Sequence, residues 1–368
     1  MMSPDNERIE GVRQIVLRHG WNATAYQLIN PGMRHRFSTQ EDAVVGYVDS
    51  GSVRVVAGAP VCSEASLERV VDEFETAAAE EGKQVCYFGA EARLAIICQR
   101  RATHSSVLLG AQPAWRPSAW RQMLAGHSSL RMQVNRARNK GVHVEEWREP
   151  SPEQKASLHR CLEEWLATRG LPPMHFLVEP GTLEYIFDRR LYVALLHDEV
   201  IAFLVASPVP MRSGWLVEQI VRKPCAPNGT AELLVDALQQ ILGAGSEYIT
   251  LGLSPLSSRA AIGMRQNPLW LRLVLSWARA HGGRFYNFDG LDAFKAKFRP
   301  EIWEPVYAIG NEPRFPPAML YAIASAFTNG EPARTILEGL SRAAAREGKW
   351  LLDRGRRLLP DVSTVGGR

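Results

Sequence analysis

The sequence is poor in cysteine, and its cysteines do not form the pairs that redox or zinc motifs require. The five cysteines lie far apart, and neither Cys-x-x-Cys nor His-x-x-x-His occurs. Isolated cysteines on apolar segments are typical of small buried side chains in a reducing compartment. The pattern argues against a disulfide framework and predicts no structural metal site.

The sequence also lacks an apolar run of about 18 residues, the length that a membrane-spanning helix needs. The longest candidate, Leu191–Met211, is interrupted by His197, Asp198 and Glu199, and we interpret it as two strands around a turn. Met1–Arg13 contains acids and no apolar core, which is unlike a secretory signal. Apolar residues make up 46% of the chain and the net charge is +4, so a mostly disordered chain is excluded. We expect a cytoplasmic protein, with peripheral contact at the inner face of the membrane as an open alternative.

Acidic residues are absent from one long window, Ala92–Val144. The window holds nine cations: Arg93, Arg100, Arg101, Arg116, Arg121, Arg131, Arg136, Arg138 and Lys140. A segment with charge of one sign attracts polyanions, either nucleic acid or an anionic membrane. The alternative is a basic, solvated helix face. Trp115 and Trp120 stand beside two of the arginines, which suits stacking or interfacial contact and equally suits a place in the core.

Strand and helix patterns alternate along the chain and then repeat. Val44–Asp49 and Val53–Ala57 are β-branched runs around Ser50-Gly51-Ser52, and a helical stripe from Leu67 to Ala78 ends before Gly82. After the turn-rich segment Glu149–Glu153, the order recurs: a helix (153–168), strands (191–196, 200–206, 215–221), a helix (230–242) with Leu234, Ala237, Leu238, Ile241 and Leu242 on one face, a strand (248–251) and a helix (269–281). The sequence therefore predicts an α+β fold of two successive modules.

We place the domain limits at residues 1–149, 150–312 and 313–368. The last segment is a predicted helical tail that is rich in cations and keeps a helical apolar stripe with Trp350 beside it. A basic amphipathic helix with a tryptophan is suited to the surface of an anionic bilayer. It is equally suited to packing against its own domain.

The segment Glu218–Thr230 has the outline of a phosphate site. A strand leads into a loop with Pro227, Asn228 and Gly229, and then a helix begins whose free N–H groups and dipole favour an anion. Arg222 and Lys223 add positive charge. The alternative is an ordinary helix cap. The Arg-x-x-Gly-x-Gly/Ala loop that binds the pyrophosphate of coenzyme A in GNAT acetyltransferases is absent.

Two further segments complete the candidate chemistry. Thr250–Ser257 is a strand end that opens into a tight turn at Gly252. In Phe285–Pro305, Lys295, Lys297 and Arg299 lie between aromatic residues. Phe294 and Phe298, spaced four residues apart, would anchor this cationic cluster to the core.

These motifs carry a family resemblance over about residues 40–310. F-Y-N-F-x-G-L-x-x-F-K-x-K-F-x-P-x-W-E-P, L-G-L-S-P-L-S, A-P-N-G-T-A-E-L-L and L-R-x-x-x-N-R-A-R-x-K-G-V resemble the C-terminal catalytic domain of phosphatidylglycerol lysyltransferases, also called multiple peptide resistance factors. The resemblance implies a tandem GNAT-like (acyltransferase) fold. It also implies transfer of an aminoacyl group from aminoacyl-tRNA to a lipid hydroxyl, with no coenzyme A and no metal, so we expect no cofactor.

The resemblance also suggests roles for residues. As the catalytic group we name Glu218, Glu232, Lys295 and Lys297, with one glutamate as acid/base or amine-binding carboxylate. Substrate binding is assigned to Arg222, Asn228, Gly229, Gly252, Ser254, Asp289 and Arg299, and contact with tRNA or membrane to Arg131, Arg136, Arg138 and Lys140. The chain departs from the family at Gln219, where the family usually has an aspartate. The family's membrane-spanning flippase half has no counterpart in this sequence, so lipid export is not expected.

Three other functions remain open at this level. One is tRNA-dependent aminoacyl transfer to an acceptor other than a phospholipid. Another is coenzyme A-dependent N-acyl transfer on the same fold, which the missing glycine-rich loop disfavours. The third is a non-catalytic module that binds anionic membrane.

Overall fold

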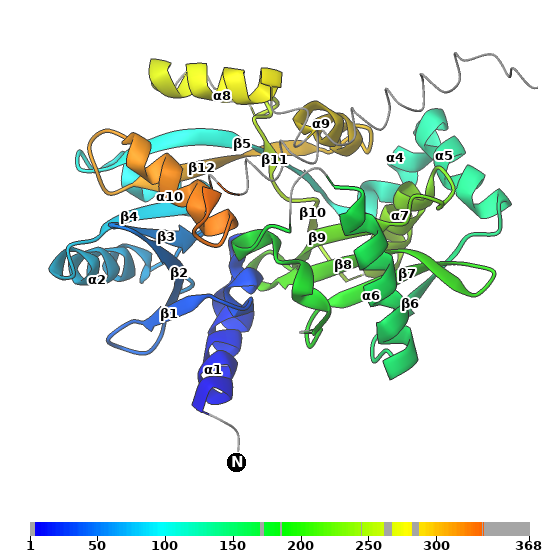
Figure 1. Ribbon diagram of the computed structural model, residues 1–368, viewed down its shortest axis with the longest axis horizontal. Helices are drawn as coiled ribbons and strands as arrows, with labels where there is room; N and C mark the ends of the chain where they lie inside the picture. The colour runs from blue at the N-terminus through cyan, green and yellow to red at the C-terminus, as the bar shows by residue number, and fades with distance from the viewer. Residues whose placement is uncertain are drawn as a thin grey trace, which may run out of the picture.

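A single twisted sheet runs through the whole molecule. The computed structural model describes residues 4–169, 173–184, 186–243, 245–260, 267–281, 287–332 and 334. In these ranges, eleven of the twelve strands pair in the order β1-β2-β3-β4-β12-β5-β10-β9-β8-β7-β6, and the twelfth, the short β11, pairs with β5 beside this path. Helices cover both faces of the sheet (Figure 1).

The first module contains the elements α1 (Pro4–His19), η1 (Ala25–Ile29), β1 (Arg34–Phe37), β2 (Val44–Ser50), β3 (Val53–Ala57), α2 (Leu67–Glu80), β4 (Gln84–Ala90), α3 (Ala92–Gln99) and β5 (Ser105–Trp115). Strands β1 to β3 are antiparallel, and β4 runs parallel to β3 after the crossover through α2. The predicted hairpin and the helix that ends before Gly82 are confirmed.

The second module repeats this order. It contains η2 (Pro117–Ala119), α4 (Trp120–Gly126), α5 (Ser128–Asn139), β6 (His143–Trp147), α6 (Pro152–Ala167), η3 (Phe176–Val178), η4 (Pro180–Glu184), β7 (Arg190–Leu196), β8 (Glu199–Val209), η5 (Pro210–Arg212), β9 (Gly214–Arg222), α7 (Thr230–Leu242) and β10 (Tyr248–Thr250). Strands β6 to β9 are antiparallel, and β10 runs parallel to β9 after α7. The predicted α+β fold of two successive modules is confirmed.

The two modules are joined by pairing between their last strands. The chain continues through β11 (Ser254–Pro255), α8 (Leu269–His281), α9 (Phe288–Ala296), β12 (Ile302–Gly310) and α10 (Pro317–Phe327). Strand β12 lies between β4 and β5 of the first module, and β5 in turn pairs with β10 of the second. The division at residue 150 is still a prediction, but strand pairing crosses it at β6, β10, β11 and β12. Of the predicted tail, residues 313–368, the structure describes α10, which packs against the core of the first module, and the cation-rich part from 335 onward lies outside the described residues.

The core of the second module shows why the apolar face predicted for residues 230–242 was only partly right. Trp115 and Trp120 are buried at 4% and 2% exposure, so they are core residues. In α7, the residues Leu233, Leu234 and Val235 are all buried, whereas Ile241, predicted on the apolar face, is 46% exposed. The reason is that α7 packs against the sheet on one side and against α5 on another, which widens its buried surface near its start.

Four cysteines are buried as expected, and Cys225 is exposed.

None of the helices in the described part of the chain has both the length and the apolar content needed to cross a bilayer.

A buried ionic cluster joins the modules. The Arg212 guanidinium of η5 binds Glu304 of β12 and donates to Glu91 at 3.1 Å. Its centre lies 3.5 Å from the ring centroid of Tyr248, whose hydroxyl donates to Glu304 at 2.8 Å. Burial raises the pKa of Glu91 to about 7, although Arg212 and the Ala23 N–H act against this rise. The cluster therefore contains a carboxyl group that titrates near neutral pH.

Candidate functional site

Strand β9 contains a bulge at the position of a predicted carboxylate. Gln219 pairs with Val205 and Val217 pairs with Ala206 across β8, so Glu218 is the extra residue. On its other side, β9 pairs with β10 only through Gly214–Leu216. The carboxyl ends of the two parallel strands therefore separate after three residues. Bulges and diverging strand ends are both common beside ligand sites of α/β sheets.

Lys295, on α9, lies beside the segment that follows β10. Its Nζ donates to the carbonyl oxygens of Gly252 at 2.9 Å and Leu253 at 2.8 Å, and the residue is 6% exposed. Gly252 has φ +68°, which allows the turn that presents these carbonyls. Burial lowers the pKa of the amine from 10.5 to about 7, and the negative charge of Asp292 acts in the opposite direction. A lysine amine of this pKa exchanges protons readily at neutral pH.

Asp292 supports the Lys295 loop and was missed by the sequence analysis. It accepts from Ser254 Oγ at 3.3 Å and from Arg259 Nε at 2.7 Å. Burial alone would raise the pKa of Asp292, but hydrogen bonds from Ser257 and Arg259 hold it below its usual value. The available signal was its position three residues before Lys295 on one helix. Ser254 is thus a buried part of the loop.

Lys297 forms an ion pair with Glu232 in the first turn of α7. Its Nζ lies 4.4 Å from the ring centroid of Phe294 and 5.7 Å from that of Phe298. The lysine side chain is 35% exposed and that of Glu232 is 10% exposed. A carboxylate at a helix start is stabilised by the helix dipole. Glu232 therefore already supplies negative charge at the start of α7, where a phosphate was predicted to bind.

The loop before α7 is closed on one side by α5. Gly229 has φ +98°, and a Cβ there would lie 2.0 Å from the carbonyl oxygen of Gln133. Arg222 donates to the carbonyl oxygen of Ala226 at 3.3 Å. Asn228 is exposed beside this packing. The predicted loop is therefore a helix-packing element as well as a candidate anion site.

Glu218 contacts neither lysine. Its Oε1 accepts from Arg189 Nε at 3.0 Å, and both side chains are at least nine-tenths buried. Arg189 also donates to Asn30, which places this pair beside η1. Glu218 Oε2 and Gln27 Oε1 are buried acceptors with no hydrogen-bond donor within reach among the described residues. No sequence pattern marks Arg189, because its partners come from distant segments.

The other predicted residues lie at the surface. Asp289 binds Arg279 at 2.6 Å and is 68% exposed, and Arg299 is exposed just after α9. Arg136 on α5 and Lys140 just after it are exposed and form no ion pair with the described residues, while Arg131 donates to carbonyl oxygens of α4. Arg138 instead pairs with the buried Asp236 at 2.8 Å. The structure thus groups Lys295 with Gly252 and Ser254, pairs Lys297 with Glu232, and separates Glu218 from both.

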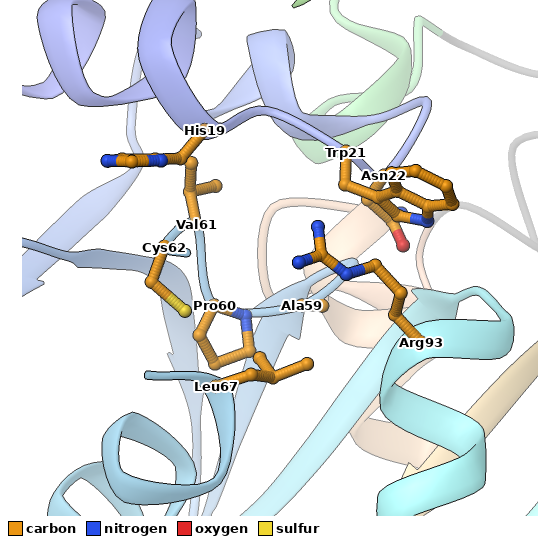
Figure 2. Close-up of a pocket in the computed structure, with 9 residues that line it drawn as sticks. All are labelled: His19, Trp21, Asn22, Ala59, Pro60, Val61, Cys62, Leu67 and Arg93. Atoms are coloured by element: carbon orange, nitrogen blue, oxygen red, sulfur yellow. The ribbon is translucent and has the colours of Figure 1, made fainter. Parts of the chain in front are cut away.

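A recess in the first module was not foreseen from the sequence. It is lined by His19, Trp21, Asn22, Ala59, Pro60, Val61, Cys62, Leu67 and Arg93. Figure 2 shows the Arg93 guanidinium reaching into it, and the guanidinium carbon lies 4.9 Å from the Trp21 ring centroid. None of the predicted site residues lines this recess.

Comparison with known proteins agrees with this architecture. Lysylphosphatidylglycerol biosynthesis bifunctional protein LysX of Mycolicibacterium vanbaalenii is 26% identical over 312 residues, which cover 80% of this chain and 28% of that protein. The LysX of Mycolicibacterium gilvum is 25% identical over 309 residues, with the same coverage. The chain thus spans less than a third of the length of these relatives.

Two solved structures share the fold. The C-terminal domain (DUF2156) of a putative lysylphosphatidylglycerol synthetase from Agrobacterium fabrum superposes with a TM-score of 0.75 at 24% identity, covering 88% of this chain and 98% of that one. L-PGS from Bacillus licheniformis gives 0.73 at 21% identity, covering 86% and 95%. The family described as "Phosphatidylglycerol lysyltransferase, C-terminal" matches residues 13–310. The chain therefore belongs to the phosphatidylglycerol lysyltransferase C-terminal family, a family of aminoacyl-transferring enzymes.

Proposed function

We propose that this chain moves an aminoacyl group from an aminoacyl-tRNA to a hydroxyl group of a membrane lipid such as phosphatidylglycerol. The observation that carries the proposal is the buried amine of Lys295, held by two carbonyl oxygens at the end of β10. Its pKa of about 7 suits it to accept and return a proton at neutral pH. Membership of the family supports the reaction class.

The reaction exchanges one ester for another. The lipid hydroxyl oxygen attacks the ester carbonyl carbon, and the neutral Lys295 amine takes the hydroxyl proton. The carbonyl carbon then loses its bond to the terminal ribose oxygen of the tRNA, and the Lys295 ammonium returns the proton to that oxygen. Because both bonds are esters, the enzyme needs positioning and stabilisation of the oxyanion more than driving force.

The remaining residues are assigned by their chemistry. Glu218 Oε2 and Gln27 Oε1 are buried acceptors without donors among the described residues, a combination that fits the ammonium group of an aminoacyl substrate. The exposed cations Arg131 and Arg136 of α5, with Lys140 just after the helix, suit the phosphates of tRNA. Lys297 and Arg222 suit a phosphate near the start of α7, with Glu232 fixing the lysine.

The test measures transfer from charged tRNAs to lipid dispersed in detergent, with products identified by mass spectrometry. We expect an aminoacyl lipid that is absent after RNase treatment. A labelled product on a peptide or small molecule would assign a different acceptor. Product formation from acetyl-CoA in place of charged tRNA would overturn the proposal.

The role of Lys295 is tested by Lys295→Arg, which keeps the positive charge but is not deprotonated at neutral pH. Loss of general acid-base catalysis predicts a fall in kcat of about 100-fold or more. Lys155→Arg, on the exposed side of α6, is the matched control. Retention of the full rate by Lys295→Arg, at an unchanged melting temperature, would show that the amine takes no part in proton transfer.

A further inference from the structure

Helix α8 has an outer face with several exposed apolar side chains. Leu271 is buried at 2% exposure, and Trp270 and Leu275 pack against the core of the first module. On the other side, Leu269, Leu273 and Trp277 follow each other every four residues and are 67%, 64% and 66% exposed. Figure 1 shows α8 in yellow along the upper margin of the molecule, far from the N-terminus. A helix that is apolar on both sides needs a second apolar environment.

The charge around α8 is of one sign along the sequence. From Tyr248 to Phe288 the chain contains no aspartate or glutamate, and it contains five arginines: Arg259, Arg265, Arg272, Arg279 and Arg284. Arg272 is exposed on α8 itself. Apolar side chains that include tryptophan, flanked by arginine, are typical of helices that lie in the interface of an anionic bilayer. Arg259 and Arg279 are paired with Asp292 and Asp289, so among the described arginines of this run Arg272 is the cation available to an anionic surface.

The helix is also tied to the Lys295 loop. Arg279 donates to the carbonyl oxygen of Leu256 at 3.3 Å and binds Asp289 of α9 at 2.6 Å. Leu256 belongs to the loop whose carbonyls hold Lys295, and α9 carries that lysine. A surface bound to the outer face of α8 therefore lies beside the elements that form the candidate site.

We propose that α8 docks the protein on the surface of an anionic lipid bilayer, with Leu269, Leu273 and Trp277 entering the interface. With 13 residues, the helix rises about 20 Å, too short for a hydrocarbon core of about 30 Å, so it lies in the plane of the membrane. The inference deepens the proposed function, on which it rests for its meaning. It brings the lipid acceptor to Lys295 from the bilayer rather than from solution.

The experiment measures sedimentation with phosphatidylcholine vesicles that contain or lack phosphatidylglycerol, without tRNA. We expect binding to the vesicles that contain phosphatidylglycerol, and a loss of about tenfold or more in Leu273→Glu, because a charged side chain replaces an apolar one in the interface. Ile96→Glu, at a 51% exposed position on α3, is the matched control and should bind as the parent does.

A site-specific probe separates docking from a general charge effect. In a Cys225→Ser background, an environment-sensitive dye on Leu273→Cys should gain intensity with the anionic vesicles, and the same dye on Ile96→Cys should not. Unchanged dye emission at position 273, or unchanged vesicle binding by Leu273→Glu, would overturn the proposal. So would a lipid-free dimer that Leu273→Glu converts to a monomer, because this face would then join two copies.

Activity distinguishes this proposal from the proposed function. Leu273→Glu should keep transfer to lipid dispersed in detergent and lose transfer to vesicles. If the parent protein transfers nothing in detergent but still binds vesicles through α8, the proposed function fails and the docking surface stands.

Discussion

Arg138 on α5 binds Asp236 on α7 across 98 positions of sequence, with an N–O distance of 2.8 Å. The Asp236 side chain is fully buried and also accepts from Trp120 Nε1 at 2.9 Å. A cation that the sequence assigned to tRNA or membrane therefore neutralises a buried carboxylate. Arg101 and Arg116 of the same acid-free window are also paired, with Glu68 at 3.1 Å and Glu301 at 2.8 Å.

Arg138→Ala is expected to lower the free energy of unfolding by about 1–2 kcal/mol, because the buried Asp236 loses its cation while its other hydrogen bonds remain. The half-exposed position of Arg138 limits the cost. Urea unfolding measures the effect. Arg136→Ala, on the same helix, should change stability by less than about 0.5 kcal/mol. Equal stabilities of the two variants would contradict the structural role.

The double variant Arg136→Ala, Lys140→Ala should weaken tRNA binding. If both side chains neutralise phosphates, the slope of log affinity against log salt should fall by about 0.7–0.9 for each phosphate that is no longer neutralised, since fewer counterions are released. Filter binding at several salt concentrations gives the slope. Arg100→Ala, an exposed cation of the first module, is the control. A double variant with the parent's slope would place the tRNA elsewhere.

Lys295 should make stability depend on pH above neutrality. Its pKa is lowered from 10.5 to about 7, so in this window the unfolded chain binds a proton that the folded protein has released. Stability from this group therefore rises as the pH increases from about 7 toward 10.5. Lys295→Met should remove that increment, while Lys297→Met should keep it. Identical pH slopes above neutrality for the parent and Lys295→Met would refute the shift.

Glu91 should make stability depend on pH below neutrality, again because burial shifts its pKa. Its pKa is raised from 4.5 to about 7, so between these values the folded protein holds a proton that the unfolded chain has lost. Stability from this group therefore falls as the pH rises from about 4.5 to 7. Glu91→Gln keeps an acceptor for the Ala23 N–H and should flatten this part of the profile in thermal unfolding. A profile as steep as the parent's would mean that Glu91 is ionised throughout.

Gly229→Ala should destabilise the packing of α5 against α7. The new Cβ would meet the Gln133 carbonyl oxygen at 2.0 Å, and the residue would keep a φ of +98°. We expect a loss of at least about 2–3 kcal/mol in the free energy of unfolding. Gly51→Ala, at φ +57° in open space, should cost only about 1 kcal/mol. Similar losses at both positions would leave backbone strain as the sole cause.

Much of the fold was already predictable from local patterns. The hairpin around Gly51 and the helix from Leu67 onward depend on turn residues and apolar spacing, which act between neighbours in sequence. The family could be identified for a similar reason, since the aromatic and lysine-rich run around Phe294 and Phe298 is contiguous. Ile241 was misplaced because burial on two sides of α7 leaves no simple one-face pattern.

The amino-acid sequence by itself determined the hairpin around Gly51, the helix from Leu67, most helices and strands of the second module, four buried cysteines and the lysines that carry the candidate chemistry. Only the tertiary structure decided which charges are available. It paired Arg138 with Asp236 and Lys297 with Glu232, left Lys295 on two carbonyl oxygens, and exposed the outer face of α8. The physical reason is that the proton affinity and accessibility of a side chain depend on the groups around it. Pairing between strands that are distant in sequence, such as β12 with β4 and β5, brings those groups together.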